Sequence, residues 1–192
     1  MSPVKLSPLD TFKKLKPDFI PLEGLALGAT DSAHQVFFGT DGNNTICVKP
    51  YTQSDNKDKT PEGTAEHEKD MLVRVKKLGF VTLKPLDIIT SHSGDMAYLI
   101  TEYEPNLTTM STIVQADDEA RRRSRELKLI NTAKTLADLH CCGITHGDAQ
   151  IKNFAISAKK PGIVVFDFEN AGTEDMGHKK HDPYLHDLES LV

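Results

Sequence analysis

The stretch GITHGDAQIKNFAIS, residues 143–157, decides how the rest of the chain is interpreted. It places His146 and Asp148, with a glycine between them, directly before a short polar loop, and Asn153 follows the acid by five residues. The apolar run NFAIS then predicts a strand, and the turn-forming AKKPG leads to a second apolar run, IVVFDF, which carries Asp167 at its end. Because two strands joined by a turn lie side by side, we expect the three polar side chains to meet at one end of a small sheet.

This combination of side chains suits phosphoryl transfer. Carboxylate and amide oxygens are the ligands that Mg²⁺ prefers. Transfer of a γ-phosphoryl group also requires a base near the acceptor hydroxyl and a cation on the α- and β-phosphates. A single acid after a strand is usually a turn residue, but three such groups at this spacing indicate a catalytic site.

The motifs His146-Gly147-Asp148, Asn153 and Asp167-Phe168-Glu169 resemble the catalytic and metal-binding loops of the protein-kinase-like superfamily. The resemblance is closest to the aminoglycoside phosphotransferase and choline kinase branch, in which the first motif reads His-Gly-Asp. It implies that Asp148 is the catalytic base and that His146 braces the loop. It also implies that Asn153 and Asp167 hold Mg²⁺ and that ATP is the phosphate donor.

The first half of the chain carries an independent pattern that fits this chemistry. Residues 34–51 contain two β-rich runs around the turn sequence DGNN, which predicts a hairpin with Lys49 on its second strand. Pro61, with Thr60 as its cap, predicts a helix that runs to about Leu78. The apolar stripe of this helix comprises Ala65, Leu72 and Val75. Glu68 shares that stripe, and a buried carboxylate needs a partner. The resemblance implies that this partner is Lys49.

Two more strands are expected over residues 81–90 and 96–103. The second strand ends where kinase-like proteins have the hinge that receives adenine. The resemblance therefore implies a nucleotide-binding role for Thr101, Glu102, Tyr103 and Glu104, and for the Lys49–Glu68 pair, which would hold the α- and β-phosphates. No glycine-rich motif precedes Lys49; the stretch LALGATDSAHQ, residues 25–35, has only Gly28.

The expected fold is α+β and two-lobed, of the protein-kinase-like kind. An N-terminal arm over 1–26 precedes an N-lobe over 27–101, which has a small antiparallel sheet and one helix. A hinge over 102–105 leads to a short helical C-lobe over 106–192. The longest helix is expected over 125–143, and Asp187 is expected to begin the next helix and to anchor the catalytic loop. The predicted apolar stripe of the long helix comprises Leu129, Ala133, Leu136 and His140.

The segment between the hinge and His146 has room for one long helix but not for the additional helices that line the acceptor site of many small-molecule kinases. On this ground we favour a protein acceptor, with an aminoglycoside-, choline- or sugar-like acceptor as the alternative. A pseudokinase that only binds is a third interpretation, and the presence of all five expected polar positions argues against it. Because the chain stops within a helix, it is a fragment, a minimal kinase, or a lobe that a partner completes.

The composition of the chain limits its expected partners and its cellular compartment. A formal net charge of −5 argues against a general nucleic-acid binder. Cys47, Cys141 and Cys142 have neither a disulfide framework nor zinc-site spacing, which favours a reducing compartment. No apolar run approaches the roughly 18 residues that a membrane span needs. We therefore expect a cytoplasmic protein with no nucleic-acid or membrane partner.

Overall fold

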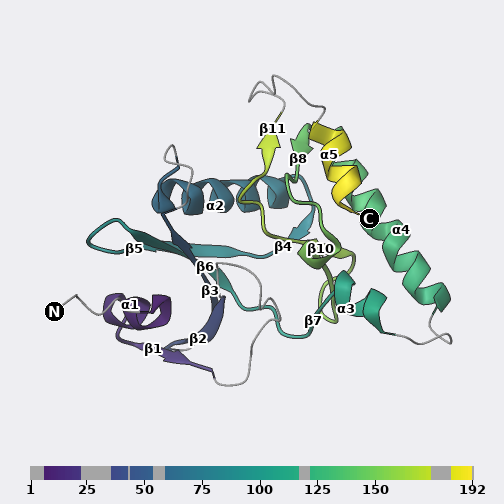
Figure 1. Ribbon diagram of the computed structural model, residues 1–192. Coiled ribbons are helices and arrows are strands. Elements are labelled where there is room, and N and C mark those ends of the chain that lie inside the picture. The colour runs from purple at the N-terminus through teal and green to yellow at the C-terminus, as the bar shows by residue number, and fades with distance from the viewer. Residues whose placement is uncertain are drawn as a thin grey trace. The chain divides into compact units, whose positions relative to one another are not determined.

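The computed structural model describes residues 7–22, 36–42, 44–53, 59–116, 122–173 and 183–191. The chain divides into two compact units. The first unit comprises residues 1–69 and 84–103, and the second comprises residues 70–83 and 104–192. Both helices and largely antiparallel sheets are present, so the predicted α+β class is confirmed (Figure 1). The predicted boundaries of arm, lobes and hinge stay predictions.

The first unit is built on a five-stranded sheet in which all neighbouring strands are antiparallel. The strand order is β1 (Phe19–Pro21), β2 (Phe37–Asp41), β3 (Asn44–Thr52), β6 (Met96–Glu102) and β5 (Pro85–Thr90). The strands β2 and β3 form the predicted hairpin, and Gly42 in its turn has a φ of 65°, a conformation that glycine adopts without strain.

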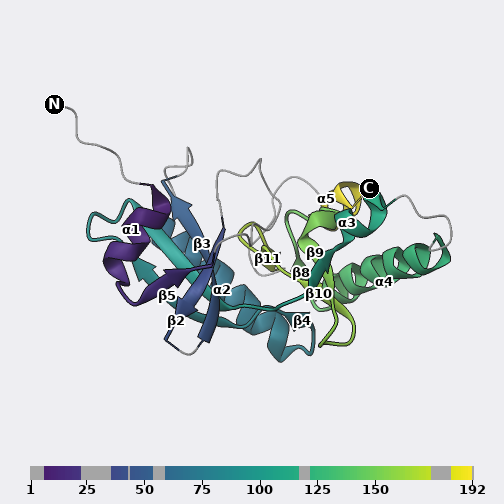
Figure 2. The same ribbon diagram turned by 90° about the horizontal axis from the view of Figure 1, so that it is seen from below.

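One face of this sheet carries an aromatic core. Ile46 and Val48 of β3 are completely buried there together with Phe12 of helix α1 (Pro8–Leu15). The helix is capped by Ser7, whose hydroxyl accepts a hydrogen bond from the Asp10 N–H, and it lies beside the sheet in both views (Figure 1, Figure 2). The segment predicted as an N-terminal arm thus contains a helix.

Helix α2 (Pro61–Lys77) begins in the first unit and ends in the second. The Thr60 hydroxyl accepts a hydrogen bond from the Gly63 N–H at 3.0 Å, so the predicted cap is present. The helix ends two residues before Gly79, whose φ is 94°. Its predicted stripe is buried throughout and comprises Ala65, Glu68, Leu72 and Val75.

The second unit contains a four-stranded sheet in the order β4 (Val81–Thr82), β10 (Ile163–Val165), β9 (Phe154–Ser157) and β7 (Leu107–Thr109). The hairpin of β9 and β10 was predicted and is confirmed. The single strand expected over 81–90 was wrong, because β4 and β5 belong to different sheets. Thr82 pairs with Val165 of β10, and Pro85, which has no N–H for a ladder, begins β5.

Helix α4 (Arg122–Cys141) is the longest of the described helices, and Gly143 follows it with a φ of 70°. Its buried side chains are Thr132, Leu136 and Leu139, so the predicted stripe was wrong at Ala133, which is exposed. The reason is that the Thr132 hydroxyl donates to the Lys128 carbonyl at 2.9 Å, which allows a polar residue in the core position.

The described part of the second unit also contains α3 (Met110–Gln115), the 3₁₀ turn η2 (Ile151–Asn153) and α5 (Pro183–Ser190). A two-stranded ladder joins β8 (Ile144–Thr145) to β11 (Gly172–Thr173). Among the described residues, no helix combines the length and the apolar character needed to cross a membrane.

Candidate active site

In the second unit, one buried carboxylate anchors the backbone of the loop around Asp148. Asp187 is completely buried, and its two oxygens accept hydrogen bonds from the N–H groups of His146 (2.6 Å) and Gly147 (2.7 Å). The Nε2–H of His140 donates to the same carboxylate at 2.9 Å. The predicted anchor is confirmed, but Asp187 lies within α5, which begins at Pro183, and not at its start.

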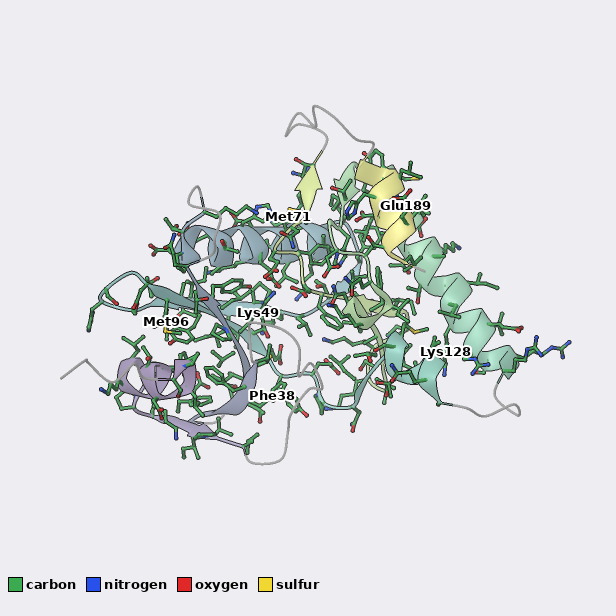
Figure 3. All side chains as sticks on the ribbon, in the orientation of Figure 1. Phe38, Lys49, Met71, Met96, Lys128 and Glu189 are labelled. Atoms are coloured by element: carbon green, nitrogen blue, oxygen red, sulfur yellow. The ribbon has the colours of Figure 1, made fainter. Side chains whose placement is uncertain are left out.

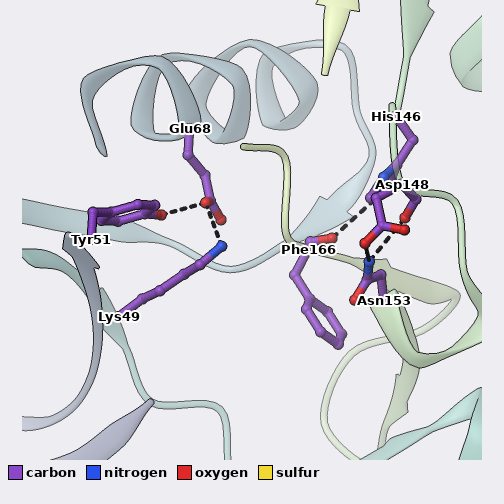
Figure 4. Close-up of polar contacts among 7 residues, drawn as sticks. All are labelled: Lys49, Tyr51, Glu68, His146, Asp148, Asn153 and Phe166. Carbon is purple, nitrogen blue, oxygen red and sulfur yellow. Dashed lines mark hydrogen bonds and ion pairs between the residues drawn. The ribbon is translucent and has the colours of Figure 1, made fainter. Parts of the chain in front are cut away.

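His146 connects this loop to the segment that carries Asp167. Its Nε2–H donates to the Phe166 carbonyl at 3.0 Å, as a bracing residue would (Figure 4). The ring packs against the rings of Phe154 and Phe168, with centroid distances of 5.6 and 4.9 Å. Nδ1 is buried and has no hydrogen-bond partner among the described residues. Burial lowers the pKa of His146 below its ordinary 6.5, so the ring is neutral at pH 7.

The glycine between His146 and Asp148 has a steric cause. Gly147 has a φ of 77°, and a Cβ atom placed on it would lie 2.0 Å from the backbone oxygen of Asn170. Real Cβ atoms do not approach a backbone oxygen this closely, so any larger residue would force the two loops apart. The glycine of the His-Gly-Asp motif is therefore required by the way these loops pack.

Asn153 fixes the position of Asp148. Its Nδ2 donates to the Asp148 carbonyl at 2.9 Å and to Oδ2 of the Asp148 carboxylate at 3.0 Å (Figure 4). Asn153 is buried at the end of the turn η2, whereas Asp148 is partly exposed. Asn153 therefore sets the orientation of the Asp148 carboxylate. The other carboxylate oxygen, Oδ1, takes no part in the contact with Asn153.

Asp167 lies two residues beyond the end of β10, not at its end as predicted, and has a φ of 68°. This left-handed conformation is uncommon for a residue other than glycine and is enriched at functional sites. The Phe166 N–H donates to the Asn153 carbonyl at 3.2 Å, so Asp167 is one residue from a direct backbone link to Asn153. The expected meeting of Asp148, Asn153 and Asp167 is thus supported by hydrogen bonds within one unit.

The oxygen atoms of Asn153 and Asp167 suit a hard divalent cation. Asn153 uses its amide nitrogen to hold Asp148, and no described residue donates to its Oδ1. An amide oxygen and a carboxylate are ordinary ligands for Mg²⁺. The residues present therefore fit the metal that the sequence implied.

The first unit contains the predicted lysine–glutamate pair. The Nζ of Lys49 lies 2.8 Å from Oε2 of Glu68, and the Glu68 side chain is only 5% exposed (Figure 4). The Tyr51 hydroxyl donates to the same oxygen, and the Lys49 ammonium lies 5.2 Å from the centre of the Tyr51 ring. Sequence reasoning missed Tyr51. Its position two residues after Lys49, on the same face of β3, was the available signal.

The predicted hinge residues divide between the units. Thr101 is buried on β6 opposite Cys47, where burial raises the pKa of the Cys47 thiol to about 12. The N–H groups of Glu102 and Tyr103 donate to the carbonyls of Lys84 (2.9 Å) and Thr45 (3.1 Å). Both N–H groups are therefore engaged within the first unit. A nucleotide-binding role for these residues stays a prediction.

Glu104 belongs to the second unit and is tied there to the β9–β10 hairpin. Its carboxylate accepts a hydrogen bond from the Ser157 hydroxyl at 2.8 Å and lies 2.6 Å from Nζ of Lys160. The bond from Lys160 is the main reason that the pKa of Glu104 lies below its usual range. The Glu104 side chain thus has a structural task. Its nucleotide role stays a prediction.

Comparison with known proteins identifies the family. Residues 46–192 match the lipopolysaccharide kinase (Kdo/WaaP) family. The chain belongs to this family. It is therefore a kinase, as the sequence predicted. No curated protein matches the chain closely enough in sequence to be counted as a relative.

A solved structure supports the fold. The chain is similar to WaaP in complex with acyl carrier protein, with a TM-score of 0.62 and 16% sequence identity over 96% of this chain and 73% of that chain. The predicted kinase-like fold is confirmed. The aminoglycoside phosphotransferase and choline kinase branch is not singled out by these findings. The preference for a protein acceptor finds no support in them either, because the matched family is one of lipopolysaccharide kinases.

Proposed function

We propose that this kinase transfers the γ-phosphoryl group of ATP, with Mg²⁺ as cofactor, to a hydroxyl group of a sugar in a lipopolysaccharide-like saccharide. The observation that carries the proposal is the loop in which Asp187 and Asn153 fix Asp148, in a chain of the Kdo/WaaP family. A sugar acceptor replaces the protein acceptor favoured from the sequence, because the family is one of saccharide-directed kinases by name.

Asp148 is the residue that we propose as the base. One oxygen of its carboxylate accepts a hydrogen bond from Asn153, which orients the other toward an incoming hydroxyl. The hydroxyl proton passes to that carboxylate as the oxygen attacks the γ-phosphorus, while the bond from this phosphorus to the β,γ-bridging oxygen breaks and ADP leaves. Because the loop is held by a buried carboxylate and a neutral histidine, this geometry exists before substrate binds, which lowers the entropic part of the barrier.

Asn153 and Asp167 are the residues that we propose to hold Mg²⁺, through Oδ1 of the amide and the carboxylate. The bound cation would neutralise charge on the transferred phosphoryl group. The left-handed backbone at Asp167 and the hydrogen bond from Phe166 to Asn153 position these oxygens without help from the metal.

Lys49 is the cation that we propose for the α- and β-phosphates. Glu68 and Tyr51 restrict its ammonium group to one region, and a restrained cation loses less freedom when phosphate binds. Glu68 is therefore a positioning residue in this proposal. It acts on the nucleotide only through Lys49.

The test is transfer of label from γ-labelled ATP, with Mg²⁺, to Kdo and to a deacylated lipopolysaccharide core, by the wild type and Asp148→Asn. We expect labelled saccharide from the wild type and at least about a 100-fold lower rate from Asp148→Asn, with nucleotide binding retained. Asp70→Asn, an exposed acid of the same unit, is the matched control and should leave the rate unchanged.

Two outcomes would contradict the proposal. Label on proteins of a lysate, but on no saccharide, would restore the protein-kinase interpretation. Binding of Mg²⁺ and ATP without transfer to either acceptor would support the pseudokinase.

A further inference from the structure

Helix α4 carries a second apolar stripe that the fold does not bury. Leu127 and Ile130 are 61% and 62% exposed, although both are large aliphatic side chains. Leu136 of the buried face lies nine residues after Leu127, which at 100° per residue places it on the opposite side of the helix. The helix is thus apolar on two sides, and only one of them packs against its unit.

A basic residue flanks the exposed pair Leu127 and Ile130 at each end. Arg123, Leu127, Ile130 and Lys134 follow one another at steps of four, three and four residues, which places them on one face over about 16 Å. Arg123 and Lys134 are both exposed, and neither forms a hydrogen bond or ion pair with another residue that the structure describes. Side chains project from this helix along its whole length (Figure 3).

The charge of α4 is opposite to that of the chain. The helix has five Lys or Arg residues and two Asp or Glu residues, whereas the whole chain has a formal net charge of −5. Positive charge is therefore concentrated beside the exposed apolar pair. This arrangement is complementary to an anionic partner that also offers apolar contact.

A second copy of the chain does not fit this stripe. If two α4 helices packed in parallel, Arg123 would face Arg123 and Lys134 would face Lys134. If they packed antiparallel, Arg123 would face Lys134. Like charges meet in both arrangements, which disfavours self-association through this face.

We propose that the α4 stripe docks the kinase on an anionic lipid surface, with Leu127 and Ile130 in the interface and Arg123 and Lys134 on lipid phosphates. Exposed aliphatic side chains can enter the membrane interface, and neighbouring Lys and Arg residues are attracted to anionic lipid phosphates. The choice of lipid over other anionic partners rests on the proposed function, whose acceptor is attached to lipid. The proposal revises the expectation of no membrane partner.

The test is co-sedimentation of the purified chain with vesicles of phosphatidylcholine alone and of phosphatidylcholine mixed with phosphatidylglycerol. We expect binding to the mixed vesicles only, and its weakening by added salt. Arg123→Gln/Lys134→Gln should bind about 30-fold more weakly, and Leu127→Gln/Ile130→Gln about tenfold more weakly. Ile20→Gln/Leu86→Gln, which changes exposed aliphatic residues of the first unit, is the matched control and should bind like the wild type.

Equal binding to both kinds of vesicle, or equal binding by all variants, would overturn the proposal. So would retention on immobilised poly-glutamate without binding to vesicles, which would indicate an acidic protein partner. Transfer to the soluble core saccharide without vesicles is measured for the same variants. Weaker vesicle binding by the two stripe variants with transfer intact supports this surface. Failure of the wild type to bind the mixed vesicles, with transfer intact, refutes only this surface, whereas failure of transfer by the wild type, with vesicle binding intact, refutes only the proposed function.

Discussion

The two units position their polar groups in different ways. In the first unit, Lys49 and Glu68 meet because each lies on a regular element, a strand and a helix, whose geometry determines the direction of the side chain. In the second unit, Asp148 and Asp167 lie on irregular backbone and are placed by hydrogen bonds from residues far along the chain. The arrangement in the first unit follows from the side-chain periodicity of a strand and a helix. The arrangement in the second unit depends on particular long-range contacts.

This difference determines where each site is vulnerable. The backbone of a helix or strand keeps its conformation when one side chain changes, because backbone–backbone hydrogen bonds hold it in place. The loop around Asp148 obtains its shape from Asp187, His146 and Gly147, so a single change there alters the backbone itself. We therefore expect larger losses from the loop than from the lysine–glutamate pair.

The largest effect is expected from Gly147→Ala. A Cβ atom would meet the Asn170 backbone at 2.0 Å in a left-handed conformation, so we expect a loss of about 4 kcal/mol in the free energy of unfolding, and of nearly all activity. Gly162→Ala is the control, because Gly162 also has a positive φ but its nearest neighbour would be 3.6 Å away. It should cost about 1 to 2 kcal/mol. Urea denaturation measures both, and equal losses would show that packing against Asn170 is unimportant.

The next effect is expected from Asp187→Asn. The amide nitrogen would replace one oxygen that accepts a backbone N–H, so two donors would face each other in a buried site. We expect a loss of about 3 kcal/mol and a fall in kcat that exceeds any change in the KM for ATP. Thermal unfolding and steady-state kinetics test this. A variant with unchanged kcat would contradict the role of Asp187 as the anchor of the loop.

A smaller effect is expected from Tyr51→Phe, which removes the donor to Glu68. Because the acceptor is the carboxylate of an ion pair, we expect a loss of about 1.5 to 3 kcal/mol and a higher KM for ATP. Tyr98→Phe on the opposite face is the control. Its hydroxyl donates to the Pro8 carbonyl, a neutral acceptor, so about 1 kcal/mol should be lost with no change in KM. The same change in the KM for ATP in both variants would contradict a specific role of the Tyr51 hydroxyl in positioning Glu68 and Lys49.

The smallest effect on the free energy of unfolding is expected from lowering the pH. Burial holds the pKa of His146 below 6.5, although Asp187, Asp167 and Asp148 oppose the shift. Below about pH 6.5 the unfolded chain binds a proton at this residue that the folded chain does not bind, so stability falls as pH falls. The contribution of one proton is at most about 1.4 kcal/mol per pH unit. His146→Gln should flatten the curve of unfolding free energy against pH, and His92→Asn, an exposed histidine, should leave it unchanged.

Much of the fold and part of the site could be predicted from the sequence. The β2–β3 hairpin, the helix α2 with Glu68 on its buried stripe, and the β9–β10 hairpin follow from turn residues and from the periods of strands and helices. The need of Glu68 for a partner follows as well, because it is an acid on an apolar stripe, and the resemblance to kinase-like proteins indicated Lys49 as that partner. These are local signals, and each is complete within a few residues.

Only the tertiary structure decided the rest. It divided residues 81–90 between two sheets, placed Tyr51 on Glu68, and put Asp167 in a left-handed turn beyond its strand. It also showed that Gly147 is required by the backbone of Asn170 and that the outer stripe of α4 is exposed. The physical reason is the same in each case: these features depend on which backbone atoms and surfaces come together from distant parts of the chain, and no local period encodes that.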